Sequence, residues 1–103
     1  MYLGFDVVLY NHKGSKIRLY ELPESLHNEI FNSKKLWRSY LELRRLSDFY
    51  LTDETFSGER LSNLINDLNN YKLFISVNEL NEYEEFIKQM SCAEISKVHI
   101  AGD

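Results

Sequence analysis

The chain has 103 residues, of which 44% are hydrophobic and 14% aromatic, and a formal net charge of −4. This length fits one domain over residues 1–103 and is sufficient to bury a core, and the aromatic content excludes a disordered tail. No apolar run approaches the ~20 residues of a transmembrane helix, and the negative net charge argues against binding dominated by phosphates.

The N-terminal segment predicts a β-hairpin. In residues 2–10, apolar side chains alternate with other side chains, which is the period-two pattern of a strand with one buried face. Residues 11–15, NHKGS, have the composition of a turn, and residues 16–22 alternate again.

Two helices are predicted next. Pro23 and Glu24 are typical of a first helical turn, and an apolar stripe then extends to Phe31. Ser33 can cap a second helix, in which apolar residues recur at spacings of three and four as far as Leu46.

Polar residues interspersed with aromatics interrupt this pattern over residues 47–56, which predicts an irregular connection. Ser57 is the expected N-cap of a third helix, whose apolar stripe runs from Leu61 to Leu68. Asn69 and Asn70 mark its expected end.

The fourth helix has the clearest start, because Ser76 and Glu79 have the spacing of a capping box. Residues 95–100, ISKVHI, alternate and are rich in β-branched side chains, so we expect a final strand there. The fold class predicted is α+β, with a small antiparallel sheet, formed by the N-terminal hairpin and the C-terminal strand, packed against about four helices. The buried face of the fourth helix is expected to contain Leu80, Tyr83, Ile87 and Met90.

Charge is unevenly distributed along the chain. Residues 48–85 carry nine acidic side chains against two basic ones, and several aromatics lie among them. Such a segment is either an ordinary solvated surface or a surface that attracts a basic partner. For the second reading, the predicted contacts are the charged Asp53, Glu54, Glu59, Glu82 and Glu85, with Tyr50 and Tyr83 as aromatic anchors.

The sequence predicts no enzyme, metal site or cofactor. Glu82 and Glu85 lie on the expected wet face of a helix, where both carboxylates ionise, so they lack the contrast in pKa that paired catalytic acids need. The three histidines are scattered, and the dispersed glycines do not form a phosphate-binding loop. An enzyme hypothesis remains open only if the fold joins Cys92 to His99 as nucleophile and base.

A basic segment, residues 34–45, supports an alternative function. Lys34, Arg38 and Arg45, with nearby aromatics, suit a small regulatory or nucleic-acid-associated protein. Glu42 interrupts this basic face and the aromatics belong to the apolar stripe, so a solvated helix face is favoured over contact with nucleic acid.

Three stretches together resemble the immunity proteins of bacterial contact-dependent growth inhibition systems: FDVVLYNHKGSKIRLYELP, SDFYLTDETFSGERLSNLINDL and NELNEYEEF. The resemblance implies a protein that binds the C-terminal domain of its cognate toxin, commonly a nuclease, and blocks the toxin's active site. A cytoplasmic location agrees with this, because the N-terminus lacks the basic head and cleavage site of a signal peptide.

Overall fold

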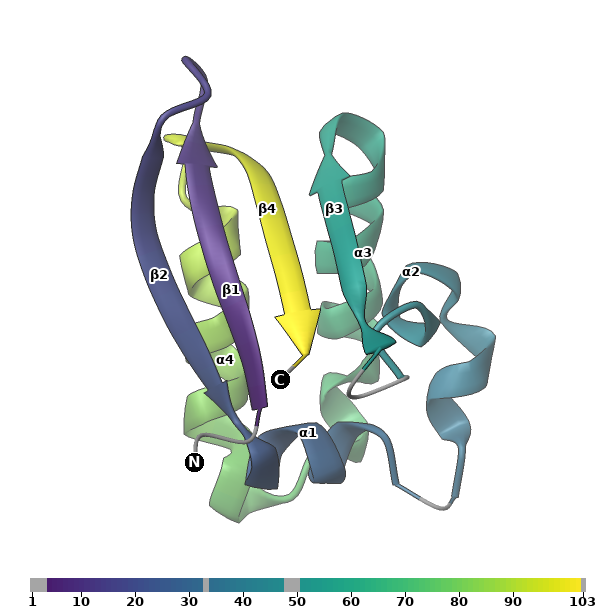
Figure 1. The fold of residues 1–103 in the computed structure, drawn as a ribbon. Coiled ribbons are helices and arrows are strands. Elements are labelled where there is room, and N and C mark those ends of the chain that lie inside the picture. The colour runs from purple at the N-terminus through teal and green to yellow at the C-terminus, as the bar shows by residue number, and fades with distance from the viewer. Residues whose placement is uncertain (1–3, 33, 48–50, 103) are drawn as a thin grey trace.

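The computed structural model describes residues 4–32, 34–47 and 51–102, and it has the predicted α+β architecture (Figure 1). Four antiparallel strands form one sheet in the order β2-β1-β4-β3. Helices α3 (Gly58–Tyr71) and α4 (Val77–Ser91) lie together on one face of it, behind the strands in Figure 1. The strands are β1 (Gly4–Asn11), β2 (Lys16–Pro23), β3 (Asp53–Ser57) and β4 (Ile95–Gly102). The shorter helices are α1 (Glu24–Ile30), η1 (Leu36–Ser39), α2 (Leu41–Arg44) and η3 (Lys72–Phe74).

The predicted hairpin and C-terminal strand are confirmed. β1 pairs with β2 on one side and with β4 on the other, so that Val7 lies opposite both Tyr20 and Ile100. Gly14 completes the hairpin turn with a φ of 80°, a left-handed conformation that glycine adopts without steric cost. Residues 2 and 3 of the predicted strand lie outside the described part of the chain.

The predicted connection over residues 47–56 is wrong at its C-terminal end, because residues 53–57 form the edge strand β3. Phe56 lies opposite Val98 of β4, and both side chains are fully buried. A single buried aromatic among polar residues gives almost no periodic signal. The strand therefore depends on pairing with β4, which is distant in the sequence.

The predicted helix over residues 34–46 is also corrected. Tyr40 has an extended backbone, with φ of −103° and ψ of 97°, and it separates η1 from α2. Its ring packs edge-on against Tyr71 at a centroid distance of 5.3 Å. The ring of Tyr40 thus contacts α3 at the residue where the backbone interrupts the apolar pattern that the sequence predicts as one helix. The predicted cap, Ser33, lies outside the described residues.

The start of α4 is where the sequence places it, but its predicted capping box is not formed. Ser76 is the N-cap residue, and its side chain makes no capping hydrogen bond. Its backbone N–H donates to the carboxylate of Glu29 in α1, at 2.7 Å, instead of to Glu79. The end of α3 also differs slightly from the prediction, because this helix continues through Asn69 and Asn70 to Tyr71.

The core lies between the sheet and α3 and α4. It includes Phe5, Val7, Leu22, Phe56, Leu64, Leu68, Tyr83, Phe86 and Ile100. His27 of α1 is buried beside the core, and the centroid of its ring lies 4.8 Å from the ring centroids of both Phe5 and Phe31. This burial lowers the pKa of His27 to about 4. Within the described residues, the helices are too short or too polar to cross a membrane.

Candidate functional site

One face of the sheet is left uncovered by α3 and α4. Because residues directly opposite each other in a sheet share a face, the strand register assigns each side chain to the helical side or to the other side. We call the second side the open face. None of its side chains is buried. It consists of Lys16, Leu19 and Glu21 of β2, Asp6, Val8 and Tyr10 of β1, Lys97, His99 and Ala101 of β4, and Asp53, Thr55 and Ser57 of β3.

Carboxylates form a row across one end of the open face. Glu21 is opposite Asp6, Asp6 is opposite Ala101, and Ala101 is opposite Asp53. Asp53 contacts Nε2 of His99 at 2.5 Å. Among residues 4–32, 34–47 and 51–102, no cation lies within ion-pair distance of Asp6 or Glu21. Two like charges therefore face each other without a partner from the described chain.

The next rows of the open face are less acidic. Leu19 is opposite Val8, and 49% of the Leu19 side chain is exposed. Tyr10 follows along β1, and the ammonium of Lys97 lies over its ring at 4.5 Å from the centroid. Lys16 lies opposite Tyr10 on the other side, so the open face changes from acidic at the Asp6 end, through a mixed row that includes Leu19 and Val8, to two lysines at the other end.

The acidic residues predicted as contacts do not gather into one patch. Asp53 lies on the open face, whereas Glu54 points to the helical side and forms ion pairs with Arg45 at 3.6 Å and Arg60 at 3.7 Å. Glu59 is exposed in the first turn of α3. The structure brings only Asp53 of these three onto the face that the helices leave uncovered.

The remaining predicted contacts belong to α4. Glu82 accepts a hydrogen bond from the phenol of Tyr20 at 2.6 Å, and Glu85 accepts one from Gln89 at 3.1 Å. Tyr83 is fully buried, so its predicted role as an aromatic anchor is wrong: the apolar stripe of the helix turns it into the core. Tyr50, the other predicted anchor, lies outside the described residues.

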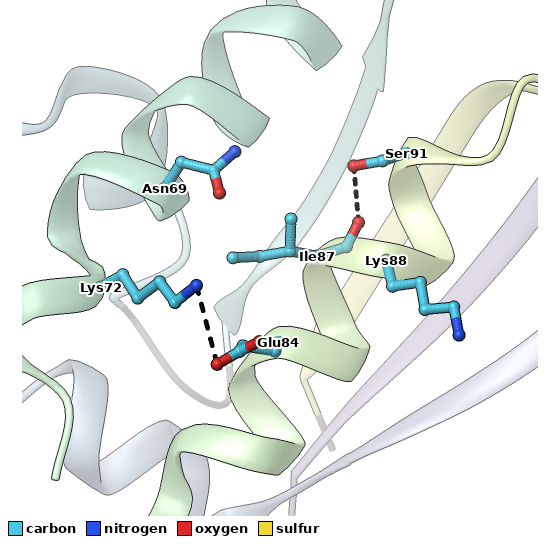
Figure 2. Close-up of a pocket in the computed structure, with 6 residues that line it drawn as sticks. All are labelled: Asn69, Lys72, Glu84, Ile87, Lys88 and Ser91. Carbon is cyan, nitrogen blue, oxygen red and sulfur yellow. Dashed lines mark hydrogen bonds and ion pairs between the residues drawn. The ribbon is translucent and has the colours of Figure 1, made fainter. Parts of the chain in front are cut away.

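A groove of about 330 Å³ lies between α3 and α4 (Figure 2). Lys72 and Glu84 form an ion pair across it at 3.6 Å, and the Ser91 hydroxyl donates to the carbonyl of Ile87 at 2.7 Å. Figure 2 shows Lys88 pointing away from Lys72. These polar groups mainly satisfy one another, so the groove is a weaker candidate site than the open face.

The other chemical hypotheses gain no support from the geometry. Cys92 donates to the carbonyl of Lys88 at 3.4 Å while His99 contacts Asp53, so the cysteine and histidine have different partners. Among the residues that the structure describes, no group of three or more metal-ligating side chains could hold an ion.

The basic segment of the alternative function is not one helix face. Lys34 and Arg38 are exposed near η1, but Arg45 follows α2 and pairs with Glu42 at 3.0 Å. The extended residue Tyr40 separates Lys34 and Arg38 from Arg45. They therefore do not form the continuous basic track that the sequence pattern indicates.

Sequence reasoning missed Asp6 and Glu21. The alternation of β1 and β2 could assign both to the wet side of a hairpin, but the exact register that places them opposite each other depends on the turn and its bulge. Comparisons with protein-family models, with curated proteins and with solved structures find no match for this chain. The function is accordingly argued from the open face.

Proposed function

We propose that this protein is an immunity protein that binds a basic toxin domain in the cytoplasm and covers the toxin's active site. The observation that supports this proposal is the open face, where unpaired carboxylates lie beside the exposed Leu19 and the partly exposed Val8. Carboxylates on an accessible surface steer a basic partner toward it, and apolar side chains supply contact area once the partner docks.

The charge of the open face favours a cationic partner. It carries three carboxylates, those of Asp6, Glu21 and Asp53, against two ammonium groups, those of Lys16 and Lys97 at the opposite end. Like charges directly opposite each other destabilise a sheet. A cation from a partner would relieve this repulsion between Asp6 and Glu21, so the bound state gains from an arrangement that costs stability in the free protein.

The open face is smaller than a typical protein interface, so in the proposed complex it would form the centre of a larger one. With strands about 4.8 Å apart and successive outward residues about 7 Å apart, its residues span roughly 15 Å in each direction. A stable protein complex buries about 800 Å² on each partner, several times this area. Residues around the sheet would therefore supply the rim of the interface.

Growth of cells that produce the toxin domain tests the proposal. The proposal predicts that a large protein with a basic C-terminal domain is encoded immediately upstream of this chain, and that domain is the partner to use. We expect this domain to arrest growth alone, co-production of the present chain to restore growth, and the two purified proteins to elute together in size-exclusion chromatography. Their association should weaken as salt concentration rises.

The proposal would be overturned if the folded chain neither restored growth nor formed a complex with that domain at low salt. A matched control is the same toxin domain with an inactivating substitution. It should still bind the chain, which separates binding from any effect of toxicity on protein production.

A further inference from the structure

We propose that the open face recognises a partner segment in which one Lys or Arg lies beside an aliphatic side chain. The cation would lie between Asp6 and Glu21, and the aliphatic group would pack on Leu19 and Val8. This inference rests on the proposed function, and it specifies the chemistry that the partner must present.

The acidic row is suited to a single cation. Directly opposite residues in an antiparallel pair have Cβ atoms about 5 Å apart, so the carboxylates of Asp6 and Glu21 can both reach one group between them. An arginine guanidinium has five N–H donors in a fixed plane, and a lysine ammonium has three. One such group can therefore donate to both carboxylates.

The apolar part of the open face has a fixed relation to this acidic pair. Leu19 and Val8 are opposite each other and lie two residues along their strands from Glu21 and Asp6, a separation of about 7 Å. Leu19 is half exposed, and burying it under a partner would remove apolar area from water. A cation alone would leave this area exposed, so a protein segment fits the face better than a small ion.

Lys97 gives the open face a direction. Its ammonium lies over the ring of Tyr10, four residues along β1 from Asp6. The acidic and basic ends are therefore separated along the strands. A segment with its cation at the Asp6 end avoids repulsion from Lys97, whereas the reversed segment does not.

The acidic helix α4 provides a comparison within the same molecule. Its carboxylates at Glu82 and Glu85 accept hydrogen bonds from Tyr20 and Gln89, and its apolar stripe packs into the core. The exposed apolar side chain of α4, Val77, lies at its first position, five and eight residues before Glu82 and Glu85. Binding by charge alone would involve α4 as well as the open face, whereas the proposed recognition is specific to the open face.

Nuclear magnetic resonance of the full isotope-labelled chain at low salt tests the inference. The probe is a short flexible peptide with one arginine and one leucine two positions apart. Two control peptides carry glutamate for the arginine or serine for the leucine. We expect the arginine–leucine peptide to shift the amide signals of Asp6, Val8, Leu19 and Glu21, the serine peptide to bind several-fold more weakly, and the glutamate peptide to cause no shift.

Shifts centred on α4, equal binding of the leucine and serine peptides, or no shift with the arginine–leucine peptide would each overturn the inference. The double variant Asp6→Asn, Glu21→Gln should weaken binding of that peptide about tenfold or more, while the matched Glu59→Gln, Glu85→Gln variant should leave it unchanged. The first variant removes a repulsion, so loss of folding is not expected to obscure the result.

The outcome is separable from that of the proposed function. Suppose that the chain restores growth against the toxin domain, and that the Asp6, Glu21 double variant also restores growth and binds that domain with unchanged affinity. In that case the inference fails and the function stands. If the peptide binds as expected but the chain gives no protection, the function fails while the chemistry of the open face remains.

Discussion

The phenol of Tyr83 in α4 donates a hydrogen bond to the backbone carbonyl of Leu68 in α3, with 2.5 Å between the oxygen atoms. Both side chains are fully buried. The burial that places the hydroxyl here also raises the pKa of Tyr83 above its usual range. This contact joins the two helices that support the sheet, so it bears on the shape of the open face on the other side.

Tyr83→Phe should lower the free energy of unfolding by about 1–2 kcal/mol, because it removes one buried hydrogen bond without changing ring packing. Urea denaturation measures the change. Tyr71→Phe is the matched comparison, since the Tyr71 hydroxyl donates to the carbonyl of Ile30 at 2.7 Å and should show a loss of similar size. Unchanged stability of the Tyr83 variant would contradict the structural role assigned to the hydroxyl.

Asp67 of α3 should fix the start of α2. Its Oδ2 accepts hydrogen bonds from the backbone N–H groups of Glu42 at 2.9 Å and Leu43 at 3.2 Å. Asp67→Ala should lower the free energy of unfolding by about 1–2 kcal/mol and accelerate hydrogen exchange at these two amides. Asp67→Asn should preserve part of the protection of these amides from exchange, because its side-chain oxygen can still accept a hydrogen bond. If the exchange rates of the Glu42 and Leu43 amides were the same in the alanine variant and the parent, the cap would not be formed in solution.

His27 should make the protein sensitive to mild acid. Its pKa is about 4 in the folded state, against 6.5 for an ordinary histidine. Between these two pH values, the unfolded chain therefore binds more protons than the folded chain does. Stability contributed by neutral His27 is present above pH 6.5, falls as the pH drops toward 4, and changes no further below that. At pH 4.5 the loss should be about 2.5 kcal/mol relative to neutral pH.

Denaturation curves at neutral pH and at pH 4.5 measure this loss, and His27→Gln is the control because it does not titrate. The glutamine variant should lose about 2.5 kcal/mol less than the parent over this interval. Equal losses in the two proteins would place the acid sensitivity in other groups.

Asp6→Asn should raise the free energy of unfolding by about 0.5 kcal/mol at low salt, because it removes one of the two opposed charges of Asp6 and Glu21. The gain should shrink as salt screens the repulsion. Glu59→Gln is expected to act in the opposite direction, since Glu59 lies in the first turn of α3, where a negative charge is favourable. Thermal unfolding at two salt concentrations measures both. A loss of stability in the asparagine variant would mean that Asp6 makes a favourable contact in the free protein.

Periodicity was enough to predict the elements with one continuous apolar face. The helix after Ser57, the helix after Ser76 and the strand over residues 95–100 all have this pattern, and all three are present. β3 and the break at Tyr40 could not be predicted, because each depends on a contact with a distant segment. The cap of α4 shows the same limit: Glu79 has the expected spacing, but Glu29 supplies the carboxylate.

The candidate site was harder to predict than the fold. Net charge along the sequence identified the acidic half, but it could not show that Glu54 is paired with arginines or that Tyr83 is buried. Asp6 and Glu21 lie in residues 1–47, where eight basic side chains outnumber five acidic ones, so a count of charge along the sequence does not single them out. Only the register of β1 and β2 places them opposite each other.

Carboxylate footprinting of the complex with the upstream-encoded toxin domain tests the central claim most directly. A carbodiimide couples exposed carboxylates to an amine, and mass spectrometry then measures the modification of each residue in the free and bound protein. We predict that Asp6, Glu21 and Asp53 become protected on binding, while Glu59 and Glu85 are modified equally in both states. Protection of Glu85 on α4 with unchanged modification of Asp6 and Glu21 would contradict the account.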